Sequence, residues 1–289
     1  MNRIAEYNHL RRSRHPRTPS DHVREAISNL CVFHHGADTA YVEVSVKIVT
    51  YNMHGKKETR WTEMIRQYDP DIILAQETYD KGIPEPRLWR KVKDSGGWGT
   101  AIYSKTGAIT ALTIPQCEGW VVGAALTGQN WSTPDGQPLS VFNIHATPDS
   151  EFGKGYVKAI NGALKALASY QKRNPATSLI IGGDFNLKTI GFNYAEQSER
   201  EREDEAAIIT SLERDFGLVS AWTLSHPGEK LPPTLLWGRD PVTQKSLEFH
   251  CDFIFVPAAW RDRILSCDIL TKQECADQSD HSPVLAAFR

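Results

Sequence analysis

The sequence predicts an α/β (α+β) fold in which two packed β-sheets are flanked by helices. Strand-sized and helix-sized patterns follow the order strand–helix–strand, then several strands, then strand–helix–strand again. No Gly/Ser-rich linker divides residues 46–289, and no repeat with a period of roughly 20–50 residues is visible. We therefore expect a single domain over 46–289.

The first strand–helix–strand group covers residues 46–77. Val46 to Asn52 alternates apolar and polar residues, which is typical of a half-buried strand. Apolar residues at helical spacing and a terminating proline predict the helix that follows: Trp61, Met64, Ile65, Tyr68 and Pro70. The segment from Asp71 to Glu77 is a buried strand that ends in polar residues.

The remaining elements follow from the same two periodicities. Four strands are expected over residues 100–104, 108–114, 121–126 and 139–145. An amphipathic helix precedes a buried strand that begins at Leu179, and its apolar positions are Val157, Ile160, Leu164 and Leu167. A highly charged helix, solvent-facing over most of its surface, is predicted from Gln197 to Asp215. Short strands complete the chain at 218–222, 252–256, 264–270 and 283–288.

Residues 1–45 differ from the rest of the chain, because they are polar, basic and only weakly periodic. The basic residues are not followed by the apolar segment that a secretory signal requires. A short helix from Asp21 to Leu30, capped by Ser20 or Asp21, is the one element expected here. We interpret residues 1–45 as an N-terminal extension that is flexible or partly helical.

Composition excludes several classes of protein. Of 289 residues, 40% are hydrophobic and 24% are charged, so disorder does not describe the whole chain. No apolar run approaches the roughly 18 residues of a membrane span. The net charge of −2 is not that of a globally basic nucleic-acid coat. Five cysteines without a C-x-x-C motif favour reduced, buried thiols and a cytoplasmic location over a zinc site.

Polar side chains stand at the ends of several predicted strands. They are carboxylates, amides and imidazoles: Asn52, Glu77, His145, Asp184, Asn186, Asp252, Asp280 and His281. Strand ends at one edge of a sheet converge, so we expect these groups to line one pocket. Carboxylates that share a pocket repel one another and raise one another's pKa, and a divalent cation removes that cost. Because soft ligands are few, Mg²⁺, or alternatively Mn²⁺, fits better than zinc.

Seven motifs containing these residues resemble the endonuclease/exonuclease/phosphatase superfamily, which has the fold of DNase I and exonuclease III. They stand in the family's order across residues 46–289: Thr50-Tyr-Asn-Met, Pro70-Asp-Ile-Ile-Leu-Ala-Gln-Glu, Trp98-Gly-Thr-Ala-Ile, Asn143-Ile-His, Gly182-Gly-Asp-Phe-Asn, Cys251-Asp-Phe-Ile-Phe and Ser279-Asp-His-Ser-Pro. The resemblance implies a four-layer α-β-β-α sandwich of two mixed sheets. It also implies a metal-dependent phosphoric ester hydrolase.

The resemblance implies a role for each matching residue. Glu77 ligates the metal, assisted by Asn52 and Asp280. Asp184 orients or deprotonates the attacking water, and Asn186 holds the phosphate or the same water. His281 contacts a phosphate oxygen, and Asp252 orients it and keeps it protonated. His145 stands where DNase I-like members place a phosphate-binding or acid histidine; the Tyr-x-Pro-Asn context of apurinic-site endonucleases is missing there, which disfavours an abasic-site activity.

Structural interpretations of the same residues remain open. Gly182-Gly-Asp-Phe-Asn is also a composition typical of a turn after a strand. His145 can be a hydrogen-bonded core histidine, and Asp252 an ordinary strand-edge carboxylate. We expect His54 to be a loop residue rather than a metal neighbour, and Trp98 to serve packing. No G-x-S-x-G or recognisable catalytic cysteine context suggests a covalent intermediate.

A basic segment follows the Glu77 strand and is the predicted substrate-binding region. Its residues are Lys81, Arg87, Trp89, Arg90, Lys91 and Lys93. Basic side chains around an aromatic ring suit a phosphate backbone and a stacked base, and a solvated loop is the alternative. We expect further basic residues to join the same face: Lys56, Lys57, Arg60 and Lys188.

Three functions are compatible with these observations. The first is a nuclease that cleaves DNA or RNA by in-line attack of an Asp-activated water. The second is a phosphatase or phospholipase of the same fold that acts on phosphoinositides, sphingomyelin or another small phosphoester. The third, a non-enzymatic binding module, is disfavoured because the set of site residues is complete. No protein partner can be inferred, and we expect a chain without residues 1–45 to retain hydrolysis.

Overall fold

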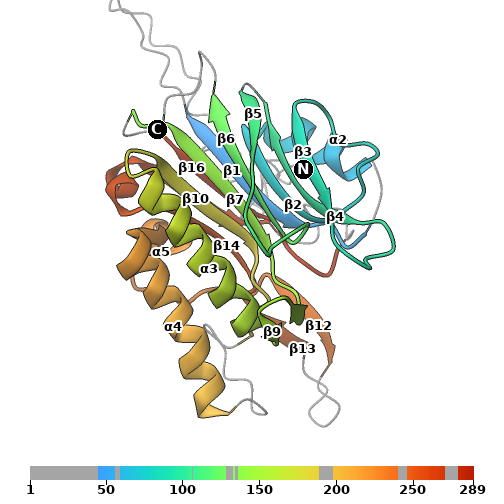
Figure 1. The fold of residues 1–289 in the computed structure, drawn as a ribbon. Coiled ribbons are helices and arrows are strands. Elements are labelled where there is room, and N and C mark those ends of the chain that lie inside the picture. The colour runs from blue at the N-terminus through green and yellow to red at the C-terminus, as the bar shows by residue number, and fades with distance from the viewer. Residues whose placement is uncertain are drawn as a thin grey trace, which may run out of the picture. The chain divides into compact units, whose positions relative to one another are not determined.

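The structure is a computed structural model that describes residues 45–55, 59–105, 107–127, 133, 136–188, 198–239, 246–270 and 279–289. The N-terminal extension and its expected helix from Asp21 to Leu30 lie outside the described residues, so the boundary near residue 45 stays a prediction. The described part is built mainly from two six-stranded sheets (Figure 1).

The first sheet has the strand order β15-β16-β1-β2-β4-β3. Its parallel neighbours are β1 and β2, in which Ile48 lies opposite Ile72 and Asn52 opposite Gln76. The chain supplies this sheet from both ends, with strands β1 (Val46–Asn52), β2 (Ile72–Thr78), β3 (Arg87–Lys91), β4 (Gly99–Ser104), β15 (Ile264–Ile269) and β16 (Val284–Phe288). Helix α2 (Thr59–Tyr68) connects β1 to β2, since two adjacent parallel strands need a crossover connection.

The second sheet repeats this plan with the order β11-β14-β10-β7-β6-β5. Its parallel neighbours are β7 and β10, in register from the pair Leu139–Ser178 to the pair His145–Asp184. The strands are β5 (Ala108–Leu112), β6 (Val121–Thr127), β7 (Leu139–His145), β10 (Ser178–Asp184), β11 (Leu218–Ser220) and β14 (Asp252–Pro257). Helix α3 (Tyr156–Arg173) connects β7 to β10, and α4 (Glu199–Phe216) follows β10.

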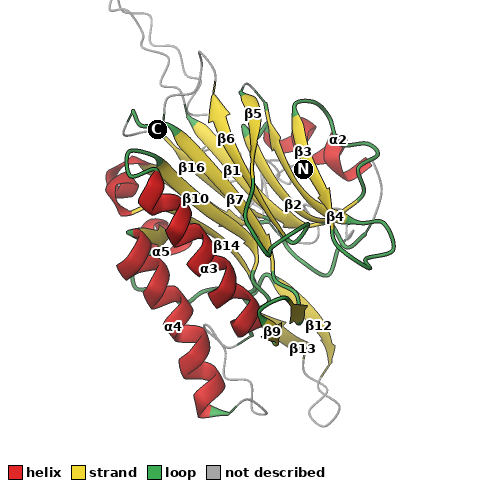
Figure 2. Ribbon diagram, in the orientation of Figure 1, coloured by secondary structure: helices red, strands yellow, loops and turns green. Residues whose placement is uncertain are grey.

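Three apolar clusters separate the four layers. Residues of the first sheet such as Ile48 and Leu74 pack against Val141 and Ile180 of the second sheet. The opposite face of the first sheet packs against α2 through Trp61. The opposite face of the second sheet is covered by α3 and α4, as Figure 2 shows, with a cluster that includes Leu164, Phe142, Phe255 and Leu212. The predicted four-layer α-β-β-α sandwich is therefore confirmed.

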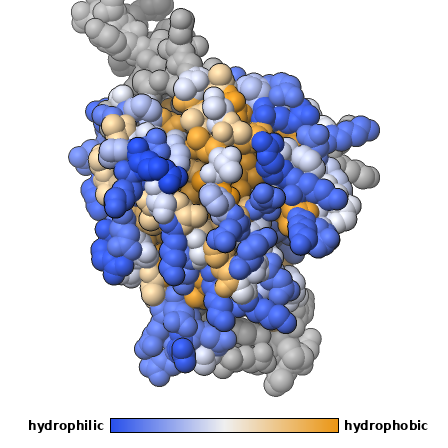
Figure 3. All heavy atoms as spheres, viewed as in Figure 1, coloured by the Kyte–Doolittle hydropathy of each residue, from blue (hydrophilic) through white to orange (hydrophobic). Residues whose placement is uncertain are grey.

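The helices leave part of the second sheet uncovered on its outer side. Apolar residues are visible on this part of the surface (Figure 3), where the residues of edge strand β5 are exposed or half-buried and those of β7 are all buried. Only one side of α4 is buried, at Glu205, Ile208, Leu212 and Phe216. This agrees with the expected charged helix, and its start is fixed by a capping box between Ser198 and Glu201.

Several small elements were not predicted. They are the hairpin β12 (Leu235–Arg239) with β13 (Ser246–Phe249), the two-residue pair β8 (Asp149–Ser150) with β9 (Gly153–Lys154), helix α5 (Ala221–Ser225) and the 3₁₀ segment Ala258–Arg263. The strand expected over 218–222 ends at Ser220, because helix α5 begins at Ala221. Such short segments carry too few residues for a clear periodicity.

Strand β3 is the largest departure from the sequence prediction. Arg87 to Lys91 pairs antiparallel with β4 along its whole length, at the outer edge of the first sheet. The charged residues that favour a loop interpretation are those that commonly protect an exposed sheet edge from pairing with another chain. Leu88 alone of this strand is buried, in the core between the sheets.

The described cysteines agree with the expectation of buried thiols. Cys117, Cys251 and Cys267 are free and buried. Burial raises the pKa of Cys117 to about 12, so this thiol stays protonated. Among the described helices, none combines the length and the apolar character needed to cross a bilayer.

Candidate active site

The two parallel strand pairs bring four of the eight predicted polar residues to one region of the sandwich, and neighbouring segments bring the others. Asn52 ends β1 and Glu77 lies near the end of β2, so both stand at the carboxyl edge of the first sheet. His145 and Asp184 end β7 and β10 of the second sheet and are direct neighbours. Asp252 begins β14 and lies opposite Asp184 on its other side. Each sheet thus presents carboxyl-terminal strand ends to the same place.

Two glycines allow β10 to hold Asp184 between its neighbours. A Cβ on Gly183, whose φ is +131°, would lie 1.9 Å from the Ile144 carbonyl oxygen of β7. A Cβ on Gly182 would lie 2.7 Å from Leu74 Cδ1 of the facing sheet. Gly182 and Gly183 are therefore strand residues that permit close packing, and the turn interpretation of Gly182-Gly-Asp-Phe-Asn applies only after Asp184.

The backbone is strained at two of the site residues. Glu77 has a φ of +49° and Asn186 a φ of +51°, both in the left-handed region that side chains other than glycine rarely adopt. At Glu77 the pairing of β2 with β4 shifts register between Ala75 and Thr78, which marks a β-bulge. Bulges redirect side chains next to functional sites. The conformation turns Glu77 out of the regular alternation of the strand.

Asn52 connects the two sheets through its amide group. Its Nδ2 donates to Glu77 Oε1 at 3.2 Å and to Asp184 Oδ2 at 2.9 Å, while its Oδ1 accepts from the His54 backbone N–H at 2.9 Å. Asn186 adds a second amide: its backbone N–H donates to Asp184 Oδ1 at 2.9 Å and its Nδ2 to Oδ2 at 3.3 Å. The Asp184 carboxylate is thus fixed by two amide side chains.

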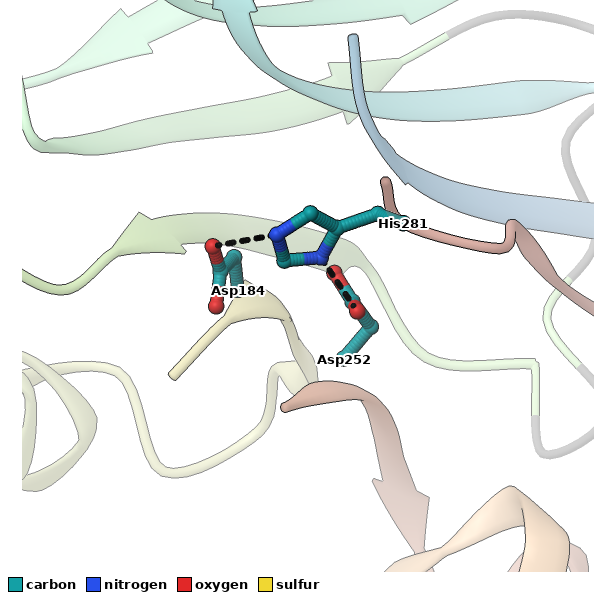
Figure 4. A group of neighbouring side chains, drawn as sticks. All are labelled: Asp184, Asp252 and His281. Atoms are coloured by element: carbon teal, nitrogen blue, oxygen red, sulfur yellow. Dashed lines mark hydrogen bonds and ion pairs between the residues drawn. The ribbon is translucent and has the colours of Figure 1, made fainter. Parts of the chain in front are cut away.

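His281 lies between two carboxylates, as Figure 4 shows. Its Nδ1 is 2.8 Å from Asp252 Oδ2, and its Nε2 is 3.8 Å from Asp184 Oδ2. Burial alone opposes protonation, but Asp252 and then Asp184 outweigh it and raise the pKa of His281 to about 10. We therefore assign a protonated imidazole at neutral pH, with Nδ1–H donating to Asp252 and Nε2–H directed toward Asp184.

His145 has a pKa that is shifted in the opposite direction from that of His281. Its Nε2 is 3.6 Å from Glu77 Oε1 and 4.0 Å from Asp184 Oδ2. Burial lowers its pKa, and the neighbouring carboxylates oppose this without reversing it. The Trp98 ring, which also packs on the core beneath α3, lies 5.2 Å from the imidazole. Trp98 therefore serves packing, as expected, and additionally shields His145.

Asp280 lies at the outer side of this group, next to His281. Its Oδ1 is 3.2 Å from His54 Nδ1, and its backbone carbonyl accepts from the Leu236 N–H at 3.0 Å. The hydroxyl of the preceding Ser279 donates to the Asn52 carbonyl at 2.8 Å. These contacts attach the segment before β16 to the end of β1. His54 is a loop residue, as expected, but its imidazole pairs with a predicted metal ligand.

The charges of the site favour a bound divalent cation. Glu77, Asp184, Asp252 and Asp280 supply four carboxyl groups, and His281 neutralises only part of their charge. Asp184, Asp252 and His281 offer ligand atoms within 4.8 Å of one another. However, Asp252 and His281 are hydrogen-bonded to each other, which already occupies Nδ1 of the imidazole and Oδ2 of the carboxylate. The Glu77 carboxylate, which is 25% exposed, fits a hard cation better; Asn52 and Asp280 stay its predicted co-ligands.

The predicted substrate-binding segment lies on and around edge strand β3. Arg87 pairs with Asp80 at 3.1 Å and with Glu85 at 2.6 Å. Trp89 donates its indole N–H to the Thr78 carbonyl at 3.0 Å and packs against the cluster beneath α2. Arg90 and Lys91 are exposed. Contact of these four residues with substrate stays a prediction.

Two further basic residues have clear positions. Arg60 is buried and its guanidinium donates to the Met53 carbonyl, so the expectation that Arg60 belongs to a basic surface is wrong. Lys188 lies two residues beyond Asn186, with Nζ 6.0 Å from the centroids of the Trp237 and Phe249 rings. Lys56 and Lys57 lie outside the described residues.

Tyr156 is a neighbour of the site that sequence reasoning missed. It is the first residue of α3. Burial raises the pKa of its phenol, and the charges of Asp184 and Glu77 act in the same direction. No motif or periodicity marks this residue, because only the packing of α3 against the second sheet brings it near Asp184.

Comparison with known proteins identifies the family. Residues 49–281 match the model of the Endonuclease/Exonuclease/phosphatase family, and the chain belongs to this family. The match includes every strand end described above, and it confirms the resemblance carried by the seven motifs.

Solved structures with the same fold include endonucleases, an exonuclease and a 3′ phosphatase. The Xenopus laevis APE2 catalytic domain is 19% identical, with a TM-score of 0.65 over 83% of this chain and 91% of its own. The 3′ phosphatase NExo from Neisseria, bound to a product DNA hairpin, is 19% identical, with a TM-score of 0.63 over 84% and 99%. Truncated Caenorhabditis elegans TDP2 is 16% identical, with a TM-score of 0.56 over 84% and 97%. At these identities the likeness shows the fold. No curated protein matches the sequence.

Proposed function

We propose that this protein is a divalent-metal-dependent phosphodiester hydrolase that cleaves nucleic acid by attack of an activated water. The observation that carries this proposal is the environment of Asp184. Its buried carboxylate is held by Asn52 and Asn186. It also lies within 4.0 Å of two imidazoles, one with a lowered pKa (His145) and one with a raised pKa (His281). We therefore propose that Asp184 acts as a base and that the two histidines beside it act on the phosphate.

Asp184 is the proposed general base. Burial raises the pKa of this carboxyl group, which makes its ionised form a better proton acceptor than an exposed aspartate. The base removes a proton from water as the water oxygen bonds to phosphorus and the P–O bond to the leaving alkoxide breaks. The two amides keep the carboxylate from rotating, which preserves its alignment with the attacking water.

His281 is the proposed donor to the phosphate. A protonated imidazole held by Asp252 is proposed to donate from Nε2–H, which faces Asp184 in the structure, to charge that develops on the phosphoryl oxygens. His145 presents Nε2 from the opposite side of Asp184 and is proposed to contact a second phosphate oxygen. Asn186 is proposed to orient the water or the same phosphate.

Glu77 is the proposed principal metal ligand, with Asn52 and Asp280 as co-ligands. A bound Mg²⁺ or Mn²⁺ would supply charge neutralisation at the phosphoryl oxygens and at the leaving oxygen. The strained backbone at Glu77 and its partial exposure support this role, because they direct a carboxylate toward the open side of the site.

Nucleic acid is the proposed substrate class. Support comes from the nucleic-acid enzymes that share the fold, including one bound to a DNA hairpin, and from exposed Arg90 and Lys91 on β3. Small phosphoesters and lipid head groups are the alternative class. They require less surface beyond the scissile phosphate than a nucleic-acid strand does.

A substrate panel under Mg²⁺ and Mn²⁺ tests both parts of the proposal. It comprises plasmid DNA, single-stranded DNA, RNA, an abasic duplex, sphingomyelin, an inositol phosphate and a chromogenic diester. We expect the nucleic acids to be hydrolysed fastest, EDTA to stop the reaction and either metal to restore it. Full activity in EDTA contradicts the metal requirement. Turnover confined to sphingomyelin or the inositol phosphate contradicts the substrate class.

A further inference from the structure

Trp237 is the most exposed large apolar side chain among the described residues. It lies in strand β12, and 61% of its surface is accessible, compared with 42% for Tyr79 and 36% for Leu265. An indole in water gives up the burial that normally stabilises a tryptophan. An accessible indole ring is suited to stacking against another planar group.

Strand β12 is attached directly to the catalytic segments. Thr234 Oγ1, just before the strand, accepts from the Cys251 and Asp252 backbone N–H groups at 2.9 and 3.1 Å. Leu235 forms a β-bridge with His281, and the Leu236 N–H donates to the Asp280 carbonyl. Trp237 is the next residue. The position of its backbone is therefore fixed relative to the His281–Asp252 pair.

Lys188 places a cation beside this ring. Its Nζ lies 6.0 Å from the centroids of both Trp237 and Phe249, at the outer limit of a cation–π contact. Lys188 follows Asn186 by two residues, a chain length that spans at most about 7 Å. Within the described part of the chain no carboxylate pairs with Lys188, so its charge is available to a ligand.

We propose that Trp237 and Lys188 form a nucleotide subsite next to the scissile phosphate. The indole stacks on the base of an unpaired nucleotide, and the ammonium group binds a neighbouring phosphate of the same strand. This inference rests on the proposed hydrolase function and specifies its substrate as a nucleic acid with at least one unstacked base. A weak surface cation–π pair alone would leave the accessible indole without a role.

Two substrates of equal charge separate the stacking contribution from the phosphate contribution. One is a single-stranded thymidine octamer, and the other is an octamer of tetrahydrofuran nucleotides, which keeps the phosphates and lacks the bases. Trp237→Ala is expected to lower kcat/KM for the thymidine octamer roughly 5- to 150-fold and to leave kcat/KM for the other octamer unchanged. Trp237→Phe, which retains a ring, is expected to recover most of the loss.

Lys188→Ala is expected to weaken binding of both octamers and to reduce the salt dependence of binding. Leu265→Ala and Lys165→Ala are the matched controls, since they remove an exposed apolar residue of β15 and an exposed cation of α3. Both controls are expected to behave as wild type. Equal effects of Trp237→Ala on the two octamers overturn the stacking assignment.

Fluorescence supplies a readout that does not depend on turnover. With EDTA present, the thymidine octamer is expected to quench tryptophan emission in the wild type and much less in Trp237→Phe. Hydrolysis of the thymidine octamer that is equally fast in wild type and Trp237→Ala overturns the subsite and leaves the proposed function intact. Hydrolysis of neither octamer nor of any nucleic acid in the substrate panel under Mg²⁺ or Mn²⁺ contradicts the proposed function. Absence of quenching by the thymidine octamer contradicts the subsite in either case.

Discussion

The two parallel strand pairs use the same topology and supply different chemistry. In the first sheet, β1 and β2 are joined through α2 and end in Asn52 and Glu77; in the second, β7 and β10 are joined through α3 and end in His145 and Asp184. The Glu77 side chain is 25% exposed, whereas that of Asp184 is 1% exposed. Burial therefore distinguishes an accessible oxygen ligand from a carboxyl group suited to proton transfer.

The backbone conformation at the two carboxylates differs as well. Glu77 projects from a bulge with a positive φ, while Asp184 stays in regular register because Gly182 and Gly183 let the neighbouring strands approach. The first pair thus turns its carboxylate out of the strand, and the second holds its carboxylate among hydrogen-bond donors. Asn52 joins the two carboxylates across the sheets.

Removal of the proposed base in the second pair gives the largest expected effect. Asp184→Asn keeps the shape and lacks the basic carboxylate, so we expect kcat to fall roughly 10²- to 10⁴-fold. Thermal unfolding is expected to change little, because a neutral side chain is buried more readily than a charged one. Asp215→Asn on exposed α4 is the control. Near-normal turnover of Asp184→Asn would show that the base lies elsewhere.

The second largest loss of activity is expected when the imidazole of His281 is removed. His281→Ala is expected to lower kcat about 10²- to 10³-fold, the usual cost of one preorganised donor. If Asp252 acts only through His281, the double variant His281→Ala/Asp252→Asn is expected to be no slower than the slower single variant. Steady-state kinetics of the three proteins provide the measurement. Multiplicative losses would mean that Asp252 has an independent role.

A smaller effect is expected from Glu77 in the first pair. Glu77→Gln keeps the size of the side chain and removes its charge, so the Mg²⁺ concentration for half-maximal activity is expected to rise at least roughly 10-fold. Excess metal should restore much of the activity, which it cannot do for Asp184→Asn. Glu213→Gln on α4 is the control. An unchanged metal requirement would remove Glu77 from the ligand set.

Buried His250, which lies just before β14, is expected to make the stability of the fold depend modestly on pH. Burial lowers its pKa to about 4, and the bond of Nδ1 to the Pro232 carbonyl opposes this only in part. In the unfolded chain the pKa is near 6.5, so stability is complete above about pH 6.5 and falls as the pH drops toward 4. The expected loss is up to about 3 kcal/mol.

His250→Asn checks this assignment, because an amide donates to the same carbonyl and does not titrate. The difference in unfolding free energy between wild type and variant is expected to shrink or reverse in favour of the variant as pH falls from about 6.5 to about 4. His226→Asn is the control. A pH-independent difference would mean that His250 is charged in the folded protein or accessible to protons.

The strands and their terminal residues were predictable because their signals are local. Residues 46–52 and 139–145 coincide with β1 and β7, since alternation or a short apolar run followed by a polar residue identifies a strand and its end. The seven motifs contain these strand ends in the order that is typical of the family, and this order identified the family. Edge strand β3 and the hairpin β12–β13 were not predicted, because their charged or short segments resemble loops.

Sequence by itself determined the layers, the family and the eight polar residues that end the strands. Only the tertiary structure decided the environments of those residues: burial lowers the pKa of His145, nearby carboxylates raise the pKa of His281, Glu77 is partly exposed and Asp184 is enclosed. It also placed Trp237 and Lys188 beside the site. The reason is physical: periodicity depends on neighbours in the chain, whereas a pKa or an exposed ring face depends on burial and on charges that arrive from distant segments.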